Sequence, residues 1–566
     1  MKNATELKKN LQEIDHKSYS LYKGLAGEYQ FKNFILCIDK VQGDPFAAPS
    51  RVRVRVPETV HSFPKKLYDE RCKRLALEDA ILRKWNRYIA KTSKGGGSGN
   101  SGRIGVCPCG QEVLERIAVV MGEHEIEARF LVGFPAKGRS ILAGELEKIL
   151  FRLVPEMIEE IFVYESYEKK VLEEVMALSI DQQYIREELK KRDLVTFLAD
   201  GSILPRESGI SERPLKDAVP FLSPGSLKVE MDLPYAGTIT GMGIPKGITV
   251  IAGGGYHGKS TLLQAIQSGV YNHIKGDGRE YVITDDTAVK IRAEDGRRIC
   301  NTDIHMFIDH LPNHKNTKNF CTENASGSTS QAGNMIEALE AGANTFLIDE
   351  DTSATNFMVR DHIMEQIVVK EKEPITPFIS WVKALHKEKG ISTIIVVGSS
   401  AAYLEVADTI LQLDFYQVKD IKETVTKVLS QYPDMCTEQK TNVPELSFER
   451  IVKKIDMSYK GRDMKVKTID TDTISLNKEN IDVRYLEQIM DRGQTIGIGY
   501  LLKYAMEDVV DNQKNMVEIV DELYKKMDKC GYSSLIPKGY SAGFPVLPRK
   551  QEVMAAWNRF RKLEVK

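Results

Sequence analysis

Hydrophobic and polar residues follow different patterns before and after about residue 200. The first part mixes strands, one of them strictly alternating, with helices whose apolar positions recur every three or four residues. The elements predicted there lie at 5–13 (helix), 34–38 and 51–56 (strands), 66–90 (helix), 125–132 (strand) and 144 to about 191 (helical). We therefore predict a mixed α+β domain over residues 1–200, with a Gly- and Ser-rich loop at 94–102.

Short apolar strands alternate with helices after a loop rich in Pro, Gly and Ser at 200–227. Strands are predicted at 248–254, 281–284, 344–351 and 392–400, and helices at 261–271 and 331–341. This alternation is typical of a parallel sheet with crossover helices, so we predict an α/β core over residues 201–425.

The last part of the chain is more polar and mixed. Helices are predicted there at 483–490, 495–509, 516–530 and 551–562. We therefore predict a smaller C-terminal α+β region over residues 426–566.

Composition places the chain among globular proteins. Its 566 residues are 42% hydrophobic and 28% charged, and no uncharged apolar run reaches 18 residues. The start of the chain lacks a secretory hydrophobic segment, so we expect a cytoplasmic protein with no membrane partner. Eight scattered cysteines, of which only Cys107 and Cys109 lie close together, favour reduced thiols over disulfides or a zinc site.

A glycine-rich loop lies between the strand at 248–254 and the helix at 261–271. Its residues are Gly253, Gly254, Gly255, Tyr256, His257, Gly258, Lys259, Ser260 and Thr261. This is the G-x-x-x-x-G-K-[ST] pattern, in which backbone N–H groups and a helix N-terminus surround phosphate. We expect Lys259 to reach the β and γ phosphates of ATP and the Ser260 hydroxyl to bind Mg²⁺.

Two acidic residues end the apolar strand at 344–351. Asp349 is expected to hold the Mg²⁺ shell through water, and Glu350 to polarise the attacking water as general base. Paired acids after a strand are common, but together with the phosphate loop they predict ATP hydrolysis, with Glu350 and Lys259 as catalytic residues.

A serine-glycine segment, Ala325 to Ala332, precedes that strand. It resembles the signature of ABC ATPases, in which a serine, glycines and a helix N-terminus of one subunit contact the γ-phosphate on the other subunit. Ser326, Gly327 and Ser328 are the candidate contacts, although an ordinary N-capped helix start would also fit the pattern. Residues 351–356 stand where ABC proteins carry a loop that crosses the dimer interface.

The chain as a whole resembles the family of predicted ATPases of the ABC class. The matching stretches lie at 41–54, 131–139, 241–247, 253–263, 276–280, 291–297, 325–332, 346–361 and 547–553. The resemblance implies a P-loop core of ABC type. A mitochondrial relative associated with RNA editing further implies a homodimeric ATPase with a basic nucleic-acid groove.

Some positions differ from better-known ABC proteins. Gly398-Ser399-Ser400 stands where a histidine would sense the γ-phosphate, so we expect slow hydrolysis. Asp285 and Asp286 replace a glutamine after the strand at 281–284, and Asp286 is a candidate Mg²⁺ ligand or solvated strand end.

Three further features leave alternatives open. Tyr235 lies 24 residues before Lys259, where ABC proteins often stack adenine, but a core tyrosine fits equally well. The charges at 292–297 could position a catalytic element or form a surface ion-pair cluster. His257 could contact phosphate or face solvent.

A basic segment at 51–103 contains fourteen Lys or Arg against five Asp or Glu, a local charge of +9. Together with Tyr68, Trp85 and Tyr88, it could bind RNA or DNA, although a solvated helix face is the commoner role of such charges. We predict an ATPase that couples its ATP state to nucleic-acid binding. The alternatives are an ATP-dependent protein-assembly or regulatory switch and a P-loop kinase.

Overall fold

The computed structural model describes residues 1–92, 95, 97–360, 367, 372–398, 400–432, 439–457, 464–537 and 543–566. Lys94, Gly96, Asp361, Ser399 and Cys436, which take part in the predictions above, lie outside these ranges. The chain divides into two compact units, Met1–Ile180 with Cys530–Leu547 and Asp181–Lys529 with Pro548–Lys566. The three-domain division stays a prediction.

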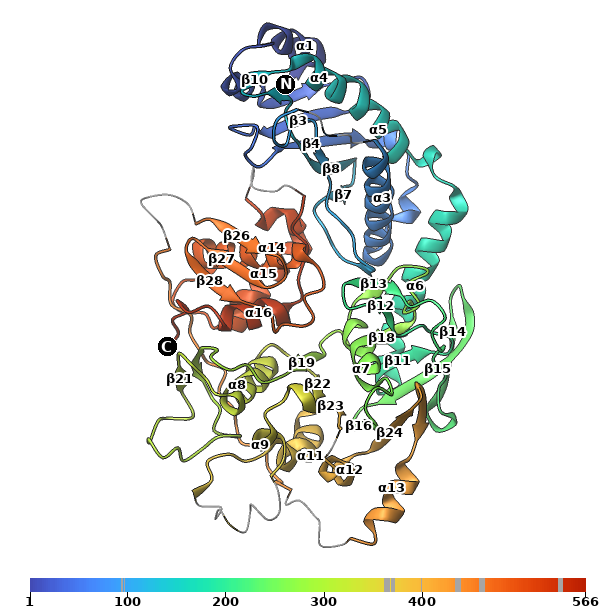
Figure 1. The fold of residues 1–566 in the computed structure, drawn as a ribbon, viewed down its shortest axis with the longest axis vertical. Coiled ribbons are helices and arrows are strands. Elements are labelled where there is room, and N and C mark those ends of the chain that lie inside the picture. Colours follow the sequence, from blue (N-terminus) through green and yellow to red (C-terminus); the bar gives the residue numbers. More distant parts are fainter. Residues whose placement is uncertain are drawn as a thin grey trace. The chain divides into compact units, whose positions relative to one another are not determined.

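A seven-stranded sheet forms the centre of the first unit (Figure 1). Its order is β1 (Lys2–Asn3), β2 (Gly27–Gln30), β3 (Ile35–Lys40), β4 (Ser50–Pro57), β8 (Glu125–Val132) and β5 (Ile104–Gly105), and β7 (Val119–Met121) also pairs with β8. The valines of β4 are buried and its arginines are half-buried, as the alternation at 51–56 predicts.

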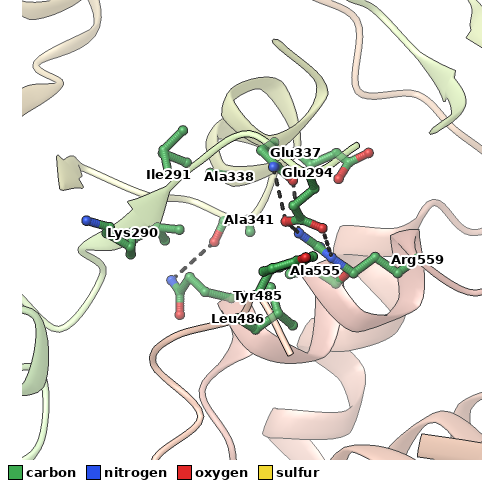
Figure 2. A pocket seen from close by; sticks show the side chains of 13 residues that line it. Lys290, Ile291, Glu294, Glu337, Ala338, Ala341, Tyr485, Leu486, Ala555 and Arg559 are labelled. Carbon is green, nitrogen blue, oxygen red and sulfur yellow. Dashed lines mark hydrogen bonds and ion pairs between the residues drawn. The ribbon is translucent and has the colours of Figure 1, made fainter. Parts of the chain in front are cut away.

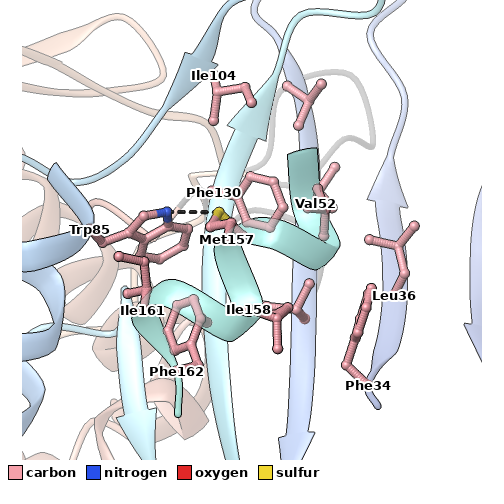
Figure 3. Close-up of a cluster of buried hydrophobic side chains, with 14 of the residues drawn as sticks. Phe34, Leu36, Val52, Trp85, Ile104, Phe130, Met157, Ile158, Ile161 and Phe162 are labelled. Carbon is pink, nitrogen blue, oxygen red and sulfur yellow. Dashed lines mark hydrogen bonds between the residues drawn. The ribbon is translucent and has the colours of Figure 1, made fainter. Parts of the chain in front are cut away.

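Helices cover one face of this sheet. They are α1 (Ala4–Glu13), α3 (Arg71–Thr92), α4 (Ala143–Lys148), the π-helix Ile149–Leu153 and α5 (Val154–Ile161), and α6 (Lys169–Lys191) runs on into the second unit. Trp85 of α3 is fully buried between Phe130 and Phe162, and its Nε1 donates to Met157 Sδ at 3.0 Å (Figure 3). The suggestion that Trp85 stacks on a nucleic-acid base is therefore wrong, because its apolar ring fills the core.

A six-stranded sheet forms the core of the second unit. Its order is β19 (Val289–Ile291), β22 (Thr345–Asp349), β23 (Ser392–Val396), β16 (Ile248–Gly253), β24 (Thr409–Asp414) and β25 (Gln417–Asp420). The paired strands from β19 to β24 are parallel where their register is described, and β25 returns antiparallel. The α/β core is confirmed.

The strand predicted at 281–284 does not belong to this parallel sheet. As β18 (Val282–Thr284), it pairs antiparallel with β11 (Leu194–Ala199) in the four-stranded sheet β14-β15-β11-β18. The other two strands form the hairpin β14 (Lys228–Leu233) and β15 (Gly237–Pro245). The run of apolar residues in 281–284 suits a buried strand of either orientation, so the pattern could not distinguish the two sheets.

The helices of the core include α7 (Lys259–Ser268), α8 (Gly327–Glu340), α9 (Thr355–Met358), α11 (Phe378–Lys389), α12 (Ala402–Val406) and α13 (Lys422–Leu429). Strands β20 (Ile299–Thr302) and β21 (Phe320–Thr322) form a separate antiparallel pair. Within the described ranges, no helix has the length and apolar character needed to cross a membrane.

The C-terminal part of the second unit pairs a small antiparallel sheet with helices. The sheet contains β26 (Val466–Ile469), β27 (Thr473–Leu476) and β28 (Glu479–Asp482), and the helices are α14 (Arg492–Tyr504), the π-helix Ala505–Val509, α15 (Met516–Cys530) and α16 (Lys550–Asn558). The helix predicted at 483–490 is wrong, since this segment forms turns. Gln488 instead exchanges hydrogen bonds with the backbone of Ala288 and Lys290.

Candidate functional site

The glycine-rich loop connects the end of β16 to the start of α7, as predicted. Gly253 and Gly258 have φ angles of 145° and 99°, which favour glycine, and a Cβ on Gly253 would lie 2.6 Å from the Leu413 carbonyl oxygen. The Lys259 ammonium donates to the carbonyl oxygens of Gly253 and Gly254 at 2.7 and 2.9 Å. The Lys259 ammonium therefore lies over this loop. The N–H groups of the loop and of the first turn of α7 are suited to bind phosphate.

The remaining loop residues differ in exposure. Gly254, Gly255, Tyr256 and Ser260 are exposed, and Thr261 is half-buried in the first turn of α7. His257 is not simply a solvent-facing residue, since its Nδ1 accepts a hydrogen bond from the Phe415 N–H at 3.0 Å. The imidazole is thereby directed toward the turn between β24 and β25.

The acidic pair lies at the same edge of the sheet as the loop. Asp349 pairs with Val396, and Val396 pairs with Ile251, so the ends of β22, β23 and β16 are aligned. Asp349 is buried, and its Oδ1 accepts from the Asp351 N–H at 3.2 Å. Because carboxyl ends of parallel strands meet at one edge, Ser260 and Asp349 suit a shared Mg²⁺, which is the hard, oxygen-preferring cation expected with ATP.

Glu350 is held in place by Gly398, at the position where a histidine that senses the γ-phosphate was expected. Its Oε2 accepts from the Gly398 N–H at 2.6 Å, directly after β23. Close by, the buried Tyr403 donates to the Met358 carbonyl at 2.7 Å, and burial together with the Glu350 charge raises the pKa of its phenol. A backbone donor therefore positions the candidate general base where the sequence has no imidazole.

The signature segment begins α8. Ser326 is the exposed N-cap residue, and its hydroxyl lies 3.0 Å from that of Thr329. Ser328 is buried and donates to Asn356 Oδ1 at 2.7 Å, while a Cβ on Gly327 would lie 3.6 Å from that of Ala354. The start of α8 therefore packs against 351–356 of its own chain and leaves Ser326 open.

Asp285 and Asp286 have hydrogen-bond partners outside the group formed by the phosphate loop, Asp349 and Glu350. Asp285 accepts from Thr287 N–H and hydroxyl, both at 2.9 Å, and the Asp286 carbonyl accepts from Arg549 Nη1 at 2.8 Å. In the described part of the chain, no hydrogen bond or ion pair joins Asp286 to Ser260 or Asp349. Asp286 as a metal ligand stays a prediction.

Tyr235 lies in the turn between β14 and β15 and is 63% exposed, so it is not a core tyrosine. Its N–H and that of Ala236 donate to the two carboxylate oxygens of Asp181, each at 2.9 Å. Burial raises the pKa of Asp181, although these two hydrogen bonds act to lower it. The tyrosine ring is available for a base.

Of the charges at 292–297, Glu294 and Arg297 are buried in ion pairs, so the surface-cluster interpretation is wrong for these two, whereas Asp295 is exposed and Arg292 is half-buried. Glu294 pairs with Arg559 (Figure 2). Arg297 Nη2 contacts Glu337 of α8 at 2.6 and 2.8 Å. Burial is the largest influence on Glu294 and acts to raise its pKa, but Arg559 and Arg297 hold it below its ordinary value. Arg559 follows α16, so this network joins α8 to the C-terminal helix.

This network lines a pocket between β19, α8 and α16 (Figure 2). Lys290 lies on its wall, where burial lowers the pKa of the ammonium despite the nearby charges of Glu487 and Asp349. The sequence analysis missed Arg559 because its partner Glu294 lies 265 residues away. The matching stretch at 547–553 and the helix predicted at 551–562 pointed to this part of the chain, but neither indicated the ion pair.

Comparison with protein families covers nearly the whole chain. Residues 4–165 match the N-terminal domain of ATPases of the ABC class, residues 168–449 the P-loop domain of ABC ATPases, and residues 465–566 the MRB1590 C-terminal domain.

Among individual proteins, an uncharacterized protein of Methanocaldococcus jannaschii is 32% identical over 250 residues. The match covers 42% of this chain and about half, 54%, of that protein. Two solved structures are each 14% identical: CbiO1 from Clostridium perfringens, part of an ABC transporter complex, and an ATP-binding cassette of an ABC transporter in its ADP conformation. They cover 43% and 42% of this chain and 96% of their own, and each has a TM-score of 0.26.

Proposed function

Because the chain belongs to the ATPases of the ABC class, we propose that it binds ATP with Mg²⁺ and hydrolyses it at sites shared by two copies of the chain. The phosphate loop, Asp349 and Glu350 lie at one sheet edge and supply one side of such a site. Ser326 of the second copy supplies the other side. In support of this role, Ser326 is exposed, and the one contact described for its hydroxyl is with Thr329.

Phosphate binding, Mg²⁺ binding and activation of water are carried out by different residues. Lys259 and the N–H groups at the start of α7 bind the β and γ phosphates, and Ser260 and Asp349 hold Mg²⁺, which neutralises phosphate charge. Glu350 polarises the attacking water, held by the Gly398 N–H. The chain has Gly398-Ser399-Ser400 and no imidazole after β23, which supports slow, switch-like hydrolysis.

The exposed Ser326 is the observation that carries the two-chain proposal, and Glu350→Gln tests it. The amide keeps the size and the Gly398 contact but cannot act as a base, so bound ATP should persist and hold two chains together. Sedimentation velocity with ATP and Mg²⁺ should show a dimer for this variant. Glu423→Gln, the same acid-to-amide change at an exposed residue in the first turn of α13, serves as the control. A Glu350→Gln protein that stays monomeric with unchanged turnover would contradict the proposal.

For the wider role, we propose that ATP state alters binding of RNA or DNA through the basic segment. Six of its fourteen cations pair with carboxylates: Arg53, Arg55, Arg71, Lys73, Arg74 and Arg83. Five others are exposed, and no ion pair is described for them: Lys65, Lys66, Arg87, Lys91 and Arg103. These five support the proposal, since unpaired cations are the groups that replace counterions on phosphates.

Alanine at all five positions should abolish salt-dependent binding of mixed-sequence RNA and DNA, measured by fluorescence anisotropy with and without ATP. A matched control removes the same charge elsewhere in the first unit, at Lys23, Lys32, Lys137, Lys169 and Lys170. If the wild-type protein binds neither nucleic acid at low salt, a protein partner and hence the assembly or regulatory alternative is favoured.

A further inference from the structure

Two aromatic residues form the turn between β24 and β25. Phe415 and Tyr416 have φ angles of 46° and 67°, and they are the two central residues between paired Asp414 and Gln417. A two-residue hairpin with both φ angles positive is normally made by Asn-Gly or similar residues, because bulky side chains are strained there. The side chains are also 75% and 56% exposed, so burial in this chain does not offset that strain.

This aromatic turn, Phe415–Tyr416, contacts the phosphate loop directly. The Phe415 N–H donates to His257 Nδ1 at 3.0 Å, and the two rings lie 5.0 Å apart between centroids. The Tyr416 N–H donates to the His257 carbonyl at 3.2 Å. A Cβ on Gly258 would lie 2.9 Å from Tyr416 Cδ1, so the tyrosine ring covers the start of α7.

The order of strands indicates which end of a nucleotide this turn would meet. β22 and β23, which end at Asp349 and near Gly398, lie on one side of β16, and β24 lies on the other side. A triphosphate whose γ-phosphate is directed toward Glu350 therefore has its nucleoside end on the β24 side of the phosphate loop. The strained, exposed rings stand on that side.

We propose that the aromatic turn is a stacking platform for the adenine ring of the ATP bound at the phosphate loop. Every base has a flat π face, and stacking on an aromatic side chain is favourable without requiring a particular hydrogen-bond pattern. The platform rests on the proposed ATP binding and adds the recognition of the base. It also explains why Phe and Tyr occupy a turn that Asn-Gly would form with less strain.

The decisive variant is Phe415→Asn with Tyr416→Gly, which keeps the turn and removes both rings. Isothermal titration of the full chain with ATP and, separately, with inorganic tripolyphosphate distinguishes the base from the phosphates. ATP affinity should fall about tenfold to a hundredfold, whereas tripolyphosphate affinity should stay within about twofold of wild type. The unliganded variant should melt at a higher temperature, because the strain is relieved.

Tyr235→Ala tests the competing base contact, since it removes an exposed tyrosine from another hairpin turn of the same unit. Tyr432→Ala, which removes an exposed tyrosine just after α13, is the matched control and should leave ATP affinity unchanged. The proposal predicts a smaller loss of ATP affinity for Tyr235→Ala than for the double variant. It is overturned if the double variant binds ATP as wild type does, or if it loses ATP and tripolyphosphate equally. Wild-type protein that binds neither ligand would instead contradict the proposed ATP binding itself.

Discussion

The phosphate loop and the α8 region are built in opposite ways, although we propose that the loop of one chain and the start of α8 of its partner contact the same ATP. Around the loop, Tyr256, Phe415 and Tyr416 hold positive φ angles with exposed side chains, and most contacts involve the backbone. Around α8, Glu294 and Glu337 are buried in ion pairs with arginines from distant segments. Strain with exposure suits a surface that a ligand completes, and buried ion pairs suit a rigid connection between elements.

The largest expected effect comes from breaking the rigid region. Arg559→Ala leaves the Glu294 carboxylate buried without its main cation, which should cost about 3–5 kcal/mol in the free energy of unfolding. Urea unfolding of the full chain measures this change. Adding Glu294→Gln should recover part of the loss.

The control for that experiment is Arg561→Ala. Arg561 pairs with Glu323 at the surface, where both side chains are half-exposed or more, so the change should cost less than about 1 kcal/mol. Equal effects of the two alanine variants would show that the α8 region is not the rigid element described.

The phosphate loop should respond differently, in activity more than in stability. Lys259→Ala should lower ATP turnover by about 10²–10³-fold, because a charged donor to the phosphates is lost. The melting temperature without nucleotide should hardly change, since the hydrogen bonds described for the ammonium are to two carbonyls of the loop itself. Lys246→Ala, which removes an exposed partner of Asp193, is the control for both measurements. A large loss of stability in Lys259→Ala but not in Lys246→Ala would contradict the difference drawn between the phosphate loop and the α8 region.

The two regions should also differ with pH. The pKa of Glu294 is held below its ordinary value in the folded chain, so its contribution to stability is present above the unfolded pKa of about 4.3. That contribution is lost as the pH falls through the folded pKa. Unfolding midpoints between pH 6 and pH 3 should therefore fall more steeply in wild type than in Glu294→Gln. Parallel curves for the two proteins would contradict this role of the ion pair.

The smallest expected effect tests strain in the loop. Tyr256 is fully exposed at a φ of 63°, so Tyr256→Gly should raise the free energy of unfolding by about 1 kcal/mol. Tyr235→Gly is the matched change at an exposed tyrosine whose φ is not positive, and it should destabilise the chain by about 0.5–1 kcal/mol. The same sign for both variants would argue against stored strain.

Local patterns were sufficient to predict much of the fold. The alternation at 51–56 predicted β4, and the G-x-x-x-x-G-K-S-T pattern between an apolar strand and a helix predicted β16 and α7 at nearly their observed bounds. Both depend on neighbours in the sequence, and so a short window contains the necessary information. The same holds for the strand that ends in Asp349 and Glu350.

The features that could not be predicted depend on distant partners. The pairing of Arg559 with Glu294, the support of Glu350 by Gly398 and the contact of the aromatic turn with His257 each join residues at least 48 positions apart. The segment at 483–490 has a helical pattern, but the hydrogen bonds of Gln488 to β19 and its approach keep it in turns. Tertiary contacts overrode local preference in that segment.

The central claim, a site shared by two chains, is tested most directly by mixing two inactive variants. Lys259→Ala disables the phosphate loop and Ser326→Arg blocks the signature, so each homodimer lacks every complete site. A mixed dimer retains one intact site, and an equimolar mixture that exchanges subunits should recover about a quarter of wild-type ATP turnover. The account is contradicted if the mixture never exceeds the turnover of the separate variants. It is also contradicted if Ser326→Arg alone retains full turnover, as a kinase would.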